Sequence, residues 1–86
     1  MEITEVNIFL QNEERLKAYV SITFDNVFVV RNLKIIDGKK GLFVSMPSRK
    51  TKEGDYKDIA HPITNEMRDL IEKKVLLAYN DKLKNS

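Results

Sequence analysis

A strict alternation of apolar and polar side chains over residues 16–24 constrains the fold of this 86-residue chain more than any other feature. Successive side chains of a strand point to opposite faces, so the segment predicts a strand with one buried face and one wet face. The remaining side chains of the segment are polar or amphipathic. The buried parity consists of Leu16, Ala18, Val20, Ile22 and Phe24.

Two more strand patterns flank this segment. Residues 3–10 alternate in the same way and predict a first strand. Asp25 and Asn26 both tolerate the left-handed conformation of tight hairpins, so they predict a turn into a third strand over residues 27–36. The apolar parity of that strand slips near residues 31–32. Either a β-bulge at this point or burial on both faces would explain the slip.

The middle of the chain predicts a fourth strand followed by a protruding hairpin. Residues 42–46 keep one apolar parity, and Pro47 ends the strand because it has no N–H for the ladder. Residues 47–58 are polar and predict an exposed hairpin arm. A short return strand is expected over residues 56–60, with Pro62 stopping it.

The last third of the chain predicts a helix over residues 64–84. Thr64 is a favourable N-cap, because its hydroxyl accepts a bond from an otherwise unpaired backbone N–H. Apolar residues recur at helical spacing and define a stripe that would face a sheet. The stripe comprises Met67, Leu70, Ile71, Val75, Ala78 and Tyr79. The chain therefore predicts one α+β domain over residues 1–86, in which residues 1–62 form an antiparallel sheet of four to five strands and one C-terminal helix covers a face.

The size and composition of the chain favour self-association. A domain of this length has a thin stability margin, and without cysteine it has neither disulfides nor thiolate metal sites to supplement its core. A second copy of the chain is therefore the expected supplement, giving a homodimer. His61 is the one histidine, and no ligand or nucleophile pattern surrounds it. We expect no catalytic residues, no metal, no cofactor and no small-molecule substrate.

No apolar run is long enough to span a membrane, and residues 1–5 lack the features of a signal peptide, so a cytoplasmic protein is expected.

The charge of the chain is unevenly distributed. The formal net charge is only +2, but residues 31–52 carry seven basic side chains against one acidic side chain. Such a segment is an electrostatic footprint for polyanions. The alternative is that surface hairpins simply carry lysines.

Two clusters within the chain are candidates for contacts with nucleic acid. The arm combines cations, hydroxyls and a ring suited to phosphates and base edges: Arg49, Lys50, Thr51, Lys52 and Tyr56. Its alternative is a solvated turn partly neutralised by Glu53, Asp55 and Asp58. The helix offers a second patch of Arg68, Lys73 and Lys74. Its alternative is pairing with Asp69 and Glu72 along the helix.

Two runs of residues carry a family resemblance. Residues 33–51, which end in M-P-S-R-K-T, and G-D-Y-K-D-I-A-H-P-I at residues 54–63 resemble the central signature of the SpoVG family (stage V sporulation protein G). The likeness extends to residues 1–6 and 18–24, and so covers nearly the whole chain.

The resemblance implies a homodimer of β-sheet subunits, each with a C-terminal helix. It also implies a regulator of gene expression that binds DNA and, in some members, RNA, and that is linked to septation and sporulation. It carries contact roles to Arg49 and Lys50 and to the pair Tyr56 and Lys57. Many members place basic residues in the first strand, where this chain has none at residues 7–10.

Two functions of different classes follow. The first is a dimeric nucleic-acid-binding regulator that grips phosphates with the arm. The second is a protein–protein interaction module that docks partners on a sheet edge or on the helix face at Leu76 and Leu77.

Overall fold

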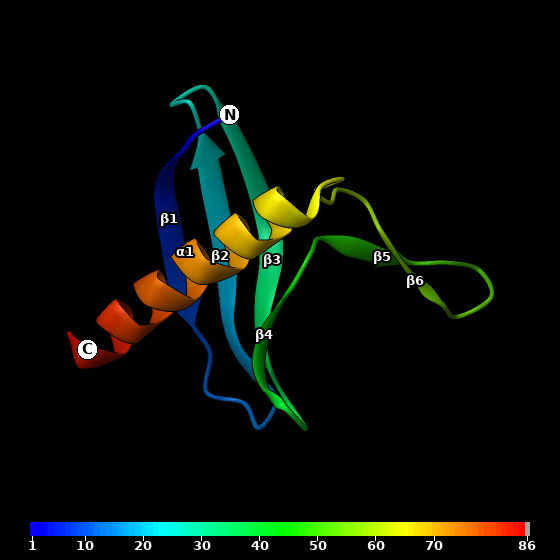
Figure 1. Cartoon of the computed structure of the whole chain (residues 1–86). Helices are drawn as coiled ribbons and strands as arrows, with labels where there is room; N and C mark the ends of the chain where they lie inside the picture. The colour runs from blue at the N-terminus through cyan, green and yellow to red at the C-terminus, as the bar shows by residue number, and fades with distance from the viewer. Residues whose placement is uncertain (86) are drawn as a thin grey trace.

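A four-stranded antiparallel sheet forms the body of the protein, and the computed structural model describes residues 1–85. The strands are neighbours in the order in which they follow one another along the chain, and a single helix crosses one face of the sheet (Figure 1). The elements are β1 (Ile3–Leu10), β2 (Leu16–Phe24), β3 (Phe28–Gly38), β4 (Gly41–Ser45) and the helix α1 (Asn65–Lys84). The predicted combination of an antiparallel sheet with one C-terminal helix is confirmed.

The core lies between the sheet and α1. From Ala18 to Phe24 the apolar parity of β2 is buried, as the alternation predicts, whereas Leu16 is half-buried. Ala18 of β2 and Val75 of α1 are both 0% exposed. From the central strand β3, Leu33 and Ile35 join this core. From α1, Ile71, Val75 and Tyr79 complete it. The hydrophobic effect of these contacts holds the helix on one face of the sheet. Within residues 1–85, no helix or strand covers the opposite face.

Two local predictions in the hairpin of β2 and β3 are confirmed. Asp25 and Asn26 have φ values of 51° and 57°, the left-handed conformation expected of the turn. The register between the strands shifts after Val20 pairs with Leu33, and Asn32 has a φ of 67°. This β-bulge turns the side chains of β3 over, which explains the slip in its apolar pattern.

The helix begins where the capping signal places it. Thr64 has extended backbone angles, and its hydroxyl accepts a hydrogen bond of 3.1 Å from the backbone N–H of Met67. Among residues 1–85, no helix is long and apolar enough to cross a membrane.

Residues 47–58 form a small sheet of their own, made of β5 (Ser48–Lys50) and β6 (Tyr56–Asp58). Figure 1 shows this arm projecting away from the main sheet and from α1. The return strand was predicted over residues 56–60, but it ends at residue 58. It pairs with β5, as expected of a hairpin arm. Pro47 is buried and lies between β4 and β5. Because it has no N–H to donate to a neighbouring strand, the main sheet ends there and the small sheet begins after it.

Candidate nucleic-acid interface

The arm is closed at both ends by hydrogen bonds. At its base, the N–H of Ile59 donates to the carbonyl of Pro47 over 2.7 Å. At its tip, the N–H of Thr51 donates to the carbonyl of Asp55 over 2.7 Å. Gly54 has a φ of +90°, a conformation that favours glycine, and so permits the tight reversal between the strands. The arm is therefore a defined ribbon rather than an irregular loop.

The register of the ribbon decides which side chains share a face. Arg49 lies opposite Lys57, and Lys50 lies opposite Tyr56. Opposed residues of an antiparallel pair present their side chains on the same face, about 4.5–5.5 Å apart at Cβ. One face of the arm therefore carries two opposed cations, and the other carries a cation beside an aromatic ring.

The cations of the arm are exposed to solvent. Within residues 1–85, the side chains of Arg49, Lys50, Lys52 and Lys57 make neither a hydrogen bond nor an ion pair. The nearby acidic residues 53, 55 and 58 thus leave these charges unpaired. The Thr51 hydroxyl oxygen accepts a bond of 3.2 Å from the N–H of Asp55. This residue, which the sequence places among the nucleic-acid contacts, uses its hydroxyl oxygen to shape the tip.

The helix residues do not form a single patch. Arg68, Lys73 and Lys74 are all exposed, and none makes an ion pair within the described residues 1–85. Helix neighbours on one face lie three or four residues apart, whereas these lysines lie five and six residues beyond Arg68. Arg68 therefore lies around the helix axis from the two lysines, and the contact of these three residues with nucleic acid stays a prediction.

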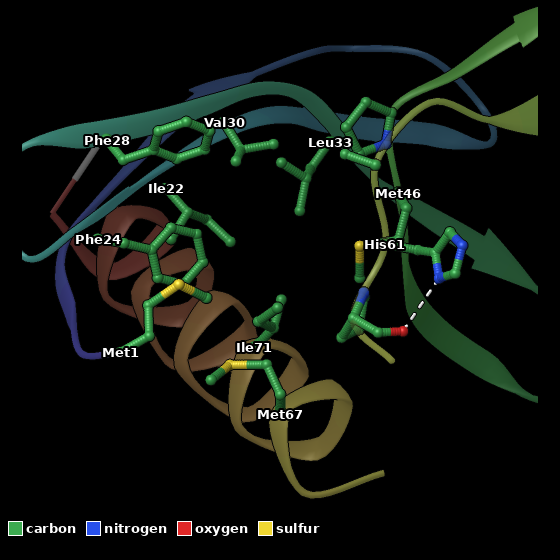
Figure 2. A pocket seen from close by; sticks show the side chains of 13 residues that line it. Met1, Ile22, Phe24, Phe28, Val30, Leu33, Met46, His61, Met67 and Ile71 are labelled. Atoms are coloured by element: carbon green, nitrogen blue, oxygen red, sulfur yellow. Dashed lines mark hydrogen bonds between the residues drawn. The ribbon is translucent and has the colours of Figure 1, made fainter. Parts of the chain in front are cut away.

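An apolar pocket of about 130 Å³ lies beside the base of the arm. Figure 2 shows Phe28 and Val30 of the sheet across this pocket from Met67 and Ile71 of α1. His61 is the one titratable side chain in its lining. Its Nδ1 lies 3.0 Å from the carbonyl of Pro62 and donates to it, because a carbonyl oxygen only accepts. The pocket thus offers packing surface rather than a set of convergent reactive groups.

Comparison with known proteins identifies the family. A family model described as SpoVG matches residues 1–81. The chain belongs to the SpoVG family. A relative from Bdellovibrio bacteriovorus is 58% identical over 99% of this chain and 79% of its own length. One from Caldicellulosiruptor saccharolyticus is 59% identical over 92% of this chain and 91% of its own length. Both carry the name "Putative septation protein SpoVG".

The match to the SpoVG model includes the whole arm and most of α1. The resemblance read from the runs at residues 46–51 and 54–63 is therefore confirmed. Those runs correspond to β5, β6 and the segment that returns from the arm to the helix.

One surface of this SpoVG domain was missed by sequence reasoning. The face of the sheet opposite α1 was assigned to solvent because its parity is mostly polar. It also carries Phe9 and Tyr19, which lie opposite one another on β1 and β2 and are 56% and 38% exposed. The sequence did contain a signal for this surface, because an aromatic residue stands at a solvent-facing position in each of the two neighbouring strands.

Proposed function

We propose that this SpoVG protein is a nucleic-acid-binding regulator of the cytoplasm, linked to septation and to sporulation-type gene regulation, and that it is not an enzyme. The observation that carries the proposal is the opposed pair Arg49 and Lys57 on an exposed ribbon, with neither cation paired within residues 1–85. The arm would grip phosphates, and the names of the relatives supply the link to septation.

The electrostatics of the arm favour an anionic partner. Like charges directly opposite each other on neighbouring strands destabilise a sheet, and cross-strand pairs contribute about 0.2–1 kcal/mol. A phosphate between Arg49 and Lys57 would turn this repulsion into two charge-assisted contacts. Because the ribbon stands away from the main sheet, an extended polyanion would reach both faces of it (Figure 1).

A salt titration of duplex DNA tests the proposal. Each phosphate neutralised steepens the fall of log K with log salt concentration by about 0.9 on duplex DNA. Four cations of one arm, Arg49, Lys50, Lys52 and Lys57, set an expected slope of up to about −3.6. The slope is measured by fluorescence anisotropy of a labelled duplex. Binding that does not change with salt, or no binding of either a duplex or a single strand at low salt, contradicts the proposal.

We also propose that the protein acts as a homodimer. Large apolar side chains are exposed around the apolar pocket: Met1 is 74% exposed and Phe28 is 63% exposed. Ile63, in the segment between the arm and α1, is also exposed. Exposed apolar clusters in a small domain favour association. Light scattering is expected to give twice the mass of the chain at micromolar concentration. The mass of a single chain would exclude the dimer under those conditions.

A protein–protein interaction module remains the second candidate. Of the two helix residues suggested for docking, Leu76 packs against the core, and Leu77 is 56% exposed. Leu77 is therefore the residue that could contact a partner. Leu77 and the free edges of β1 and β4 are the surfaces that favour this function. The salt titration separates the two candidates, because an interaction module without affinity for nucleic acid gives no anisotropy change at any salt concentration.

A further inference from the structure

The face of the sheet opposite α1 is hollowed into a groove of about 540 Å³. The groove runs over β1, β2 and β3, and its lining differs from one end to the other. Phe9 and Tyr19 form an aromatic end. Polar side chains of the same parity line the middle, and the bulge of β3 contributes Arg31 and Asn32. No element of residues 1–85 covers this face.

The aromatic end can stack on flat rings. Phe9 lies opposite Tyr19, and Tyr19 lies opposite Lys34, so the three side chains form a row across three neighbouring strands. Aromatic side chains on an open sheet stack on unpaired bases, and a cation in the same row attracts the connecting phosphates. In a duplex the bases are already stacked on one another, so this row can serve only bases that are splayed out.

The middle of the groove offers hydrogen-bonding groups without partners. Ser21 is only 9% exposed, and within residues 1–85 its hydroxyl makes no hydrogen bond. No fully buried polar side-chain atom of the described residues lacks a partner, so this hydroxyl reaches the groove. The register places Ser21 opposite the bulge, where Arg31 is exposed and unpaired within the same residues.

The groove favours bases over phosphates and over a second protein surface. Glu5 lies in its lining and accepts a bond of 3.2 Å from the amide of Asn7. A carboxylate repels phosphate but accepts hydrogen bonds from the amino groups of bases. The cores of homodimer interfaces are mostly apolar, whereas hydroxyl, amide and charged groups line this groove between its aromatic end and Val29.

We infer that the open face of the sheet binds the unpaired bases of a single-stranded nucleic acid, with Phe9 and Tyr19 stacking on bases and Ser21 and Arg31 contacting their edges. The inference rests on the proposed nucleic-acid-binding function and deepens it. The arm supplies the phosphate contacts common to single and double strands, and the groove adds a preference for single strands.

Replacement of Tyr19 by threonine tests this assignment, because threonine suits a strand but cannot stack. The affinity for an unstructured labelled single strand of cytosine and thymine is expected to fall about 5-fold to 150-fold, the range of one lost base–aromatic stack. The affinity for a mixed-sequence duplex is expected to stay within twofold. Tyr19→Phe, which keeps the ring, should retain the affinity for the single strand. Phe9→Thr, on the edge strand, provides the same test should Tyr19→Thr not fold.

The outcomes distinguish this inference from the proposed function. If the unaltered protein binds neither single nor double strands, the proposed function fails, and the inference fails with it. If the protein binds both but Tyr19→Thr and Phe9→Thr leave single-strand affinity unchanged, only the inference is overturned. If these variants convert a dimer to a monomer in light scattering, the face is a contact between copies, which also overturns it.

Discussion

Replacement of both Arg49 and Lys57 by alanine is expected to reduce the salt slope of duplex binding by about 1.8, the contribution of two phosphates at about 0.9 each. The two side chains share one face of the exposed arm, so the variant removes a single cationic pair. Within residues 1–85, neither side chain makes a hydrogen bond or an ion pair, so the fold should tolerate the change. The measurement is anisotropy of a labelled duplex across a series of salt concentrations, with circular dichroism as a check of folding.

A matched control separates the position of the charges from their number. Lys39→Ala combined with Lys40→Ala removes the same net charge from two exposed positions between β3 and β4, outside the arm. This control is expected to retain most of the salt slope. An equal loss of slope in the two double variants would mean that net charge, and not the arm, governs binding.

Ile35→Ala is expected to lower the free energy of unfolding by about 2–5 kcal/mol, the usual cost of truncating a buried isoleucine to alanine. Ile35 is 0% exposed on the central strand β3, within the core that α1 closes. Small domains have total stabilities of about 5–15 kcal/mol, so this single change consumes a large share of the stability. Equilibrium unfolding in urea measures the effect as a shift of the transition midpoint.

The control for this variant is Leu77→Ala, which deletes the same number of carbon atoms from a helix position that is 56% exposed. A change within about 0.5 kcal/mol is expected there, as for most surface substitutions. A loss at Leu77 equal to that at Ile35 would place Leu77 in a buried contact, such as an interface between subunits.

The main sheet and the helix were predictable because their signals are local. The alternation over residues 16–24 indicates which face of the strand is buried. Thr64 marks the start of the helix, and the apolar stripe after it indicates which side of the helix packs on the sheet. The change of parity at residues 31–32 located the irregularity in the third strand, but burial on both faces would also have explained it, and the strand register decided for the bulge. Period and parity, which decide the buried faces of the strand and the helix, can be read from the sequence alone.

The arrangement of the candidate sites was less predictable, because it depends on which residues pair. The basic composition of the arm is plain in the sequence, but the opposition of Arg49 and Lys57 requires the register of β5 with β6. The groove requires the register of three strands together with the bulge at Asn32.

The separation of the arm from the main sheet has a consequence for how such proteins diverge. The core residues lie in β1, β2, β3 and α1 and at Met46, and none lies in β5 or β6. Substitutions on the arm can therefore accumulate with little effect on folding. The runs of residues that carry the family resemblance nevertheless lie on this ribbon, so a requirement other than folding maintains them.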